Sequence, residues 1–297
     1  MRIDMPTLQA WMLAARPKTL PAAVGPVLVG SALAFADGKF KLIPAVAALA
    51  IALLLQIGVN LANDYFDGIR GIDTLDRLGP IRVTQSGLIS PGGVKSAMML
   101  TFMLAVLIGF YLMTRGGWPV VLLGTASILA ALGYSGGPFP LASHGLGDLF
   151  VFIFFGLVAV CGTYYVQTLQ LTWRVITMAA LVGLLITAIL VINNLRDIHT
   201  DQKAGKTTLA VMLGERGSKI EYTVLLALAY FALPLLWITG QVSLRVLIPF
   251  FSLPWAVSLI RAAWQSAVSP ALNILLAKTA ALSFTYSFLL ALALLLD

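Results

Sequence analysis

Long apolar stretches separated by short polar segments occupy most of the chain. A helix that crosses the hydrocarbon core of a bilayer, about 30 Å thick, needs about 20 predominantly apolar residues. Nine stretches come close to that length. The pattern therefore predicts an all-α membrane protein with nine transmembrane helices in one domain, residues 1–297. The predicted helices cover residues 19–36, 41–63, 94–114, 118–134, 149–166, 173–195, 220–239, 244–261 and 271–296.

The composition supports lipid as the solvent of this chain. Apolar residues make up 60% of the 297 residues, charged residues only 10%, and the mean hydropathy is +0.95. A globular protein carries roughly 25% charged residues, so this chain has too few charges to cover a water-facing surface. The single cysteine, Cys161, cannot form a disulfide within the chain. Soluble, disordered and disulfide-scaffold classes are therefore excluded.

The basic residues predict how the helices are oriented. A net charge of +7 would suggest a nucleic-acid partner in a soluble protein, but here we expect none. With nine spans, thirteen of the 19 Lys and Arg fall in the connections on one side and five on the other, while Lys278 lies inside the last span. The positive-inside rule then places the thirteen-charge side and the N-terminus in the cytoplasm, in a multi-pass protein of the cell inner membrane.

Half of the twelve acidic residues fall in two short segments, after the second and the sixth apolar stretch. In the first segment, offsets of three and four residues put a row of carbonyl and carboxylate groups on one helix face, provided that the helix continues through Asp67. The members of this row are Gln56, Asn60, Asn63, Asp64 and Asp67.

The second segment repeats this arrangement. Asn193, Asp197 and Asp201 follow one another at steps of four, and Asn193 to Asp197 matches Asn60 to Asp64 at a separation of 133 residues. This echo suggests two pseudo-halves, residues 19–134 and 149–261, plus the last helix, 271–296.

Carboxylates that converge at one membrane face repel one another unless a cation lies between them. Oxygen ligands, with only two His and one Cys in the chain, favour Mg²⁺ over zinc or copper. Magnesium is commonly bound by a few carboxylates together with substrate phosphates, so we expect a diphosphate substrate. Basic residues beside the acids can take phosphate oxygens: Arg70, Arg77, Arg82, Arg196, Lys203 and Lys206.

At these residues the sequence resembles the UbiA superfamily of intramembrane prenyltransferases. The two motifs of that family read here as Asn63-Asp64-Tyr-Phe-Asp67 and Asp197-Ile-His-Thr-Asp201. The opening at 16–21, the stretch 73–82 and the segment 193–209 resemble the branch that acts on 1,4-dihydroxy-2-naphthoate. One departure concerns a third acid of the first motif, where this chain has Gly71. Either Asp73 replaces that acid or the first metal relies on Asn60, Asp64 and Asp67.

The resemblance implies nine helices around a central cavity that opens toward the cytoplasmic side, with two Mg²⁺ ions holding an allylic diphosphate. It also implies the reaction: transfer of a polyprenyl group from its diphosphate to 1,4-dihydroxy-2-naphthoate, with loss of CO2 and diphosphate, in menaquinone or phylloquinone biosynthesis. Two alternatives stay open. One is another acceptor, such as 4-hydroxybenzoate or homogentisate; the other is a cation-coupled secondary transporter.

The predicted site combines three sets of residues. The catalytic acids are Asp64, Asp67, Asp197 and Asp201. The metal-binding set adds Asn60, Asn63, Asp73 and Asn193 to these acids. The substrate-binding set is Arg16, Lys18, Arg70, Arg77, Arg82, Tyr134, Arg196 and Lys206.

Two roles within the substrate-binding set can be stated more closely. An electron-rich ring is needed beside the allylic cation, and Tyr134 is favoured for it. The carboxylate of the acceptor needs a cation, which Arg16 and Lys18 or Arg77 and Arg82 could supply; Arg82 is favoured.

Overall fold

Helices make up nearly all of the structure, a computed structural model that describes residues 7–71, 78–240 and 242–297. The α-helices are α1 Thr7–Ala15, α2 Pro21–Ala36, α3 Leu42–Ile69, α4 Pro91–Gly116, α5 Trp118–Ser135, α6 Gly147–Val151, α7 Ala159–Thr168, α8 Trp173–Lys203, α9 Leu209–Ile238, α10 Leu253–Gln265 and α11 Leu272–Leu295. The other helical segments are three 3₁₀ segments and one π-helical segment. The 3₁₀ segments are η1 Pro17–Thr19, η2 Leu141–His144 and η4 Leu244–Ser252, and the π-helical segment is η3 Phe152–Val158.

The helices confirm the predicted all-α membrane fold. Among the described residues, eight helical stretches are long and apolar enough to cross a membrane, and α1–η1 with α2 makes a ninth if this bent pair is one span. The pair bends by 46° at the break between Thr19 and Pro21, and Arg16 adopts a left-handed backbone (φ 51°) between α1 and η1. Prolines at 17 and 21 start η1 and α2 and prevent one continuous helix.

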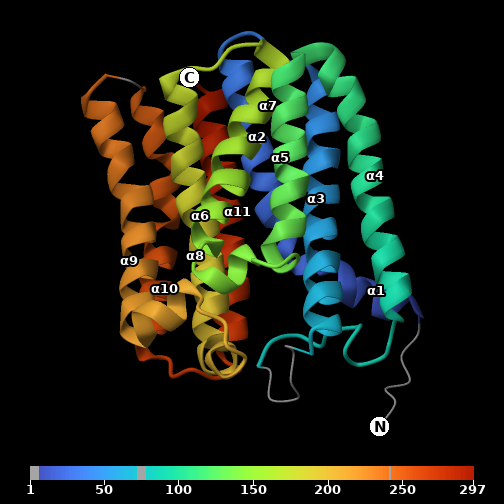
Figure 1. Cartoon of the computed structure of the whole chain (residues 1–297). Helices are drawn as coiled ribbons and strands as arrows, with labels where there is room; N and C mark the ends of the chain where they lie inside the picture. Colours follow the sequence, from blue (N-terminus) through green and yellow to red (C-terminus); the bar gives the residue numbers. More distant parts are fainter. Residues whose placement is uncertain (1–6, 72–77, 241) are drawn as a thin grey trace.

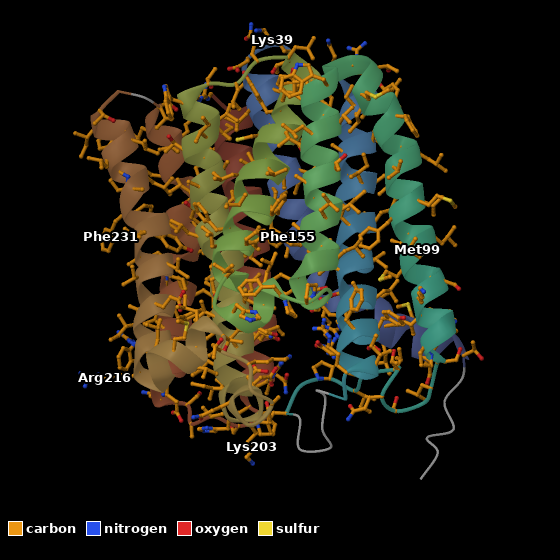
Figure 2. All side chains as sticks on the ribbon, in the orientation of Figure 1. Lys39, Met99, Phe155, Lys203, Arg216 and Phe231 are labelled. Atoms are coloured by element: carbon orange, nitrogen blue, oxygen red, sulfur yellow. The ribbon has the colours of Figure 1, made fainter. Side chains whose placement is uncertain are left out.

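Two helices carry the acidic segments to the same end of the bundle (Figure 1). Helix α3 continues six residues beyond the predicted end at residue 63, and α8 continues eight beyond residue 195. Lys203 and Arg216 lie at this end in Figure 2, and Lys39 lies at the opposite end. The polar extensions of α3 and α8 therefore meet at one face of the bundle.

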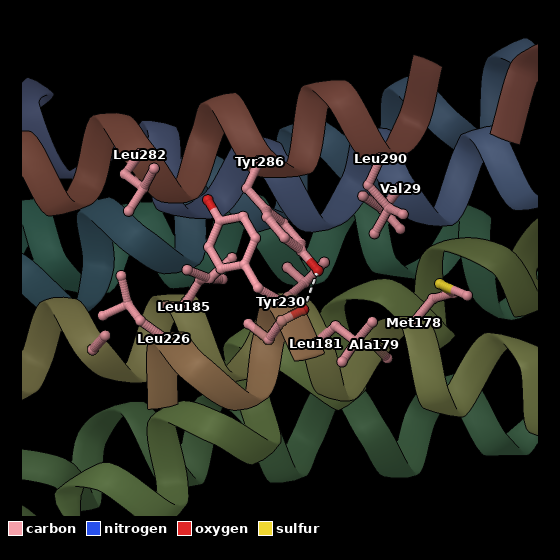
Figure 3. Packing of buried hydrophobic residues seen from close by; sticks show 14 of the residues in the cluster. Val29, Met178, Ala179, Leu181, Leu185, Leu226, Tyr230, Leu282, Tyr286 and Leu290 are labelled. Atoms are coloured by element: carbon pink, nitrogen blue, oxygen red, sulfur yellow. Dashed lines mark hydrogen bonds between the residues drawn. The ribbon is translucent and has the colours of Figure 1, made fainter. Parts of the chain in front are cut away.

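The largest cluster of buried apolar side chains lies between α2, α8, α9 and α11. Figure 3 shows Tyr230 of α9 and Tyr286 of α11 at its centre, where their rings meet edge to face with centroids 5.2 Å apart. The Tyr286 hydroxyl donates to the Ala229 carbonyl at 2.7 Å, and the Tyr230 hydroxyl pairs with Ser252 at 2.6 Å. Buried polar groups in this part of the membrane are thus satisfied within the protein.

The predicted span 149–166 is present but is not a regular α-helix. Its middle is the π-helical segment η3, between α6 and α7. A Cβ on Gly156 of η3 would lie 2.5 Å from the Cα of Gly183 on α8, so the close approach of these backbones requires glycine. Segment η3 also lines the large cavity described below, consistent with the tendency of π-helical turns to occur at functional sites.

Candidate active site

A small polar pocket of about 110 Å³ lies where α3, α5 and α8 end. Three carboxylates line it: Asp67 from α3, and Asp197 and Asp201 from α8. Nine of the residues predicted for the site line this pocket: Arg16, Asn63, Asp67, Arg82, Tyr134, Asn193, Asp197, Asp201 and Lys206. The two acidic segments therefore meet in space, although their roles stay predictions.

Lys206 links the two acidic segments. Its Nζ atom lies 3.8 Å from an Asp67 oxygen and 3.7 Å from an Asp201 oxygen, and all three side chains are at most 15% exposed. Arg82 also contacts Asp67, at 3.2 Å. Carboxylates from two different helices thus converge on one cationic atom.

Arg196 is almost fully buried and holds Asp197 from the adjacent position on α8. Its Nε donates to one Asp197 oxygen at 2.9 Å and its Nη2 to the other at 2.5 Å. The guanidinium also donates to the side-chain oxygens of Asn193 at 2.9 Å and Asn273 at 2.8 Å. Arg196 itself does not line the pocket; it orients Asp197, which does.

Asp64, predicted as a metal ligand, lies outside the pocket lining. It is buried, and its two oxygens accept the backbone N–H groups of Val83 at 3.1 Å and Thr84 at 2.8 Å. In this conformation Asp64 anchors the connection between α3 and α4.

The side chains of Asn60, Asn63 and Arg70 contact neighbouring elements. Asn60 donates to the Ala15 carbonyl at 3.0 Å and to Thr19 at 3.1 Å, which ties the end of α1 and η1 to α3. Asn63 accepts from the Ser135 hydroxyl at 2.7 Å. Arg70 donates to the carbonyls of Ser135 and Gly137. Of these three, only Asn63 lines the polar pocket.

The predicted site has three further residues. Lys18 is exposed on η1 and does not line the pocket. Asp73 and Arg77 lie outside the described residues, so the question of a third acid in the first motif stays open.

A second, apolar cavity of about 540 Å³ adjoins the polar pocket. The two share Arg16, Asn63, Tyr134, Leu190 and Asn193. Its walls come mainly from apolar side chains of α2, α3, α4, α5, η3, α7 and α8; Phe155 of η3, midway along the bundle in Figure 2, is one of them. A polar head group and a long apolar chain can therefore occupy adjoining spaces.

The donor set of the polar pocket fits a hard divalent cation. Three carboxylates with the amides of Asn63 and Asn193 line the pocket, and such oxygen ligands suit Mg²⁺. Among the described residues no three His, Cys, Asp or Glu side chains are already grouped to hold one ion. Lys206 and Arg196 neutralise the carboxylates instead. Because Asp67 and Asp201 both lie within 4 Å of the Lys206 Nζ atom, the two carboxylates are close enough to share one metal ion.

Several residues at or near the pocket were not predicted from the sequence. Ser135, Thr200 and Thr208 line it, and Asn273 contacts Arg196 from α11. Asn194, next to the predicted Asn193, also lines it. The one signal for Asn273 in the sequence is that it is the single side-chain amide of the last helix, in its first turn.

The family model and the similar proteins all point to the same family. The model of the UbiA prenyltransferase family matches residues 23–275. The 1,4-dihydroxy-2-naphthoate octaprenyltransferase of Mycobacterium tuberculosis is 44% identical over 225 residues, 76% of this chain and 77% of that protein. The protein of that name from Escherichia coli is 43% identical over 224 residues, 73% of each chain. The 2-carboxy-1,4-naphthoquinone phytyltransferase of Synechocystis is 30% identical over 260 residues, 86% of this chain and 82% of that protein.

Solved structures give the same fold. An apo UbiA homolog from Aeropyrum pernix aligns with a TM-score of 0.67 at 17% identity over 99% of each chain. A UbiA homolog from Archaeoglobus fulgidus bound to GPP and Mg²⁺ aligns with a TM-score of 0.67 at 16% identity, over 97% of this chain and all of that chain.

Proposed function

The chain belongs to the UbiA prenyltransferase family and is a multi-pass membrane prenyltransferase, and from this premise we propose its reaction. The enzyme transfers a polyprenyl group from an allylic diphosphate to 1,4-dihydroxy-2-naphthoate. The allylic carbon–oxygen bond breaks and the diphosphate leaves with the bonding pair. The carboxyl-bearing ring carbon attacks the allylic carbon, and CO2 departs, leaving its electron pair to the ring.

One observation carries this proposal: the three-carboxylate pocket adjoins the large apolar cavity. The pocket suits a charged diphosphate head, and the cavity suits an isoprenoid chain that stays in apolar surroundings. Relatives at 43–44% identity that are named for the naphthoate acceptor support the choice of substrate. The family membership sets the transporter alternative aside.

We propose Mg²⁺ as the metal, held by Asp67, Asp197 and Asp201 with the amides of Asn63 and Asn193. The Archaeoglobus homolog solved with GPP and Mg²⁺ supports this choice. When bound, the metal supplies positive charge that stabilises the leaving diphosphate.

Residues of the chain itself perform the other tasks. Lys206 lies between Asp67 and Asp201, so its ammonium can turn to phosphate oxygens that enter the pocket. Tyr134 and Arg16 line both spaces. At that junction the Tyr134 ring faces the position of the allylic cation. Arg82, favoured from the sequence as the cation for the acceptor carboxylate, contacts Asp67 and lines only the polar pocket. We therefore assign the acceptor carboxylate to the Arg16 guanidinium instead. The apolar walls exclude water, which would otherwise trap the cation.

The decisive test uses the purified full chain in lipid nanodiscs with a polyprenyl diphosphate, 1,4-dihydroxy-2-naphthoate and Mg²⁺. Diphosphate and CO2 should be released in equal amounts, together with a prenylated product. Diphosphate release without CO2 would point to another acceptor, such as 4-hydroxybenzoate or homogentisate. No turnover with any of these acceptors would contradict the proposal.

We also propose that the polar pocket opens on the cytoplasmic side of the inner membrane. The extensions of α3 and α8, which carry the acids, lie at the end where the Lys- and Arg-rich connections gather (Figure 2). That distribution is the positive-inside signal. A single cysteine introduced at exposed Lys203, in a Cys161→Ala background, should react with an impermeant maleimide only in inside-out vesicles.

The apolar cavity should determine how well long donors bind. Gly124 of α5 lines it, and a Cβ there would meet no atom within 4 Å. Gly124→Leu adds a side chain to the cavity wall at a position where a Cβ meets no neighbour. The isoprenoid chain loses part of its space, so the KM for a long polyprenyl diphosphate should rise about tenfold, which corresponds to about 1.4 kcal/mol of binding free energy. The KM for a five-carbon allylic diphosphate should change less than twofold.

The matched control for Gly124→Leu is Leu122→Phe, which adds bulk two residues away at a side chain that is 58% exposed and does not line the cavity. We expect this variant to keep wild-type kinetics with both donors. Equal effects of Gly124→Leu on short and long donors would place the isoprenoid chain elsewhere.

A further inference from the structure

Asn273, in the first turn of α11, contacts the supports of both acidic segments. We propose that it is a positioning residue with two tasks: it latches the connection 78–86 beside the polar pocket, and it holds Arg196 against Asp197. The proposal rests on the proposed function for the reaction that the latch serves, whereas the latch itself is defined by contacts within the protein.

Both ends of the Asn273 amide are used. Its Oδ1 accepts from Nη1 of Arg196 at 2.8 Å, and its Nδ2 donates to the Leu78 carbonyl at 2.8 Å. The partners lie 77 and 195 residues away in the sequence. A half-buried amide in an apolar helix is costly unless it is hydrogen-bonded, and here its two bonds join α8 to the connection between α3 and α4.

The Leu78 contact fixes one end of a segment that reaches the pocket. Four residues later, Arg82 lies buried against Asp67 at 3.2 Å. The next two backbone N–H groups, of Val83 and Thr84, donate to Asp64. The Arg82 contact depends on Asp67, a carboxylate that metal binding would engage in the proposed site. Asn273 is a neutral anchor, so its hold on the segment does not depend on the charge state of the pocket.

The Arg196 contact acts on the second acidic segment. The Nε and Nη2 atoms of Arg196 face Asp197, and Nη1 faces Asn273. Asn193 binds the guanidinium from the same helix, whereas Asn273 binds it from a different helix. Loss of the Asn273 oxygen would remove the bond that restrains the guanidinium from outside α8, and the orientation of Asp197 would loosen. One side chain thus positions the Arg82 and Asp197 sides of the pocket together.

The test measures tryptic cleavage after Arg82 in the full chain in nanodiscs, with the fragment that begins at Val83 identified by mass spectrometry. Arg82 is buried, so cleavage requires local opening of the segment and its rate follows the open population. Asn273→Leu removes both contacts at similar volume. We expect cleavage to become about fivefold faster, the effect of losing a typical hydrogen bond.

Asn273→Asp separates the two tasks. Its carboxylate still accepts from Arg196 but cannot donate to the Leu78 carbonyl. We expect faster cleavage in both variants, a raised KM for the diphosphate donor in both, and a fall in kcat of about tenfold in Asn273→Leu only. The control is Thr279→Val, on the same helix as Asn273, which removes a buried hydrogen bond of 2.9 Å to Tyr222 of α9. This control should leave the cleavage rate unchanged.

Wild-type cleavage rates in both folded Asn273 variants would overturn the latch. Equally fast cleavage in Thr279→Val would also overturn it, because the effect would then be general destabilisation. A wild-type protein without turnover of the naphthoate would contradict the proposed function instead, and the cleavage rates would still decide on the latch.

Discussion

Asp201→Asn is expected to lower kcat/KM about a thousandfold while the protein remains folded. Asp201 lines the polar pocket, its side chain is only 15% exposed, and it shares Lys206 with Asp67. An amide at this position keeps the size of the side chain but removes a full negative charge. Loss of a group that stabilises charge in the transition state typically costs 10²–10³ in rate, and loss of a proposed metal ligand should reach the upper end of this range.

Stability should hardly change in Asp201→Asn, because Lys206 keeps its contact with Asp67 and the new amide oxygen can still accept from it. The matched control is Glu215→Gln. Glu215 is a carboxylate on α9 whose side chain is 43% exposed; it lies 3.3 Å from His199 and does not line the pocket. Kinetics across a Mg²⁺ titration should show a higher metal requirement for Asp201→Asn alone. A rate within tenfold of wild type would remove Asp201 from the site.

The fold could be predicted from the sequence because membrane helices are encoded locally. About twenty apolar residues suffice for each span, and the predicted family follows from two short motifs. The boundaries were less predictable. The apolar pattern stops at residue 63, yet α3 runs to Ile69, because polar residues at the membrane surface extend a helix without any apolar signal.

The two acidic segments show how far a helical stripe can be interpreted. On α8 the stripe is realised as predicted, since Asn193, Asp197 and Asp201 all line the pocket. On α3 the stripe divides: Asp67 faces the pocket, whereas Asp64 faces the backbone of Val83 and Thr84. Periodicity gives the face of a helix, but the neighbour that covers each part of that face depends on tertiary packing.

The supporting contacts could not be predicted at all. Asn273 and Leu78 are separated by 195 residues, and no spacing rule connects a single amide in the last helix to a loop near the start of the chain. The apolar cavity is similarly hidden, because side chains that line it look in the sequence like side chains that face lipid. Only the arrangement of the helices distinguishes the two.

Asp197→Ala is expected to impair folding as well as turnover. Arg196 is 2% exposed, and both Asp197 oxygens accept from it. Removing the carboxylate leaves a buried guanidinium without its counter-charge, which typically costs about 3–5 kcal/mol. The midpoint of thermal unfolding in nanodiscs should fall clearly below that of wild type. Loss of activity in this variant alone would therefore not identify Asp197 as a ligand.

Two further variants separate the structural role of Asp197 from its role in the reaction. Asp197→Asn removes the counter-charge but retains one oxygen that accepts from Arg196, so it should unfold at a temperature between those of Asp197→Ala and wild type and still lose turnover about a thousandfold. Adding Arg196→Met to Asp197→Ala removes the uncompensated charge and should recover much of the lost stability, but no turnover. If Asp197→Asn kept wild-type turnover, Asp197 would serve only as a hydrogen-bond acceptor for Arg196, and the proposed metal site would lose its central carboxylate.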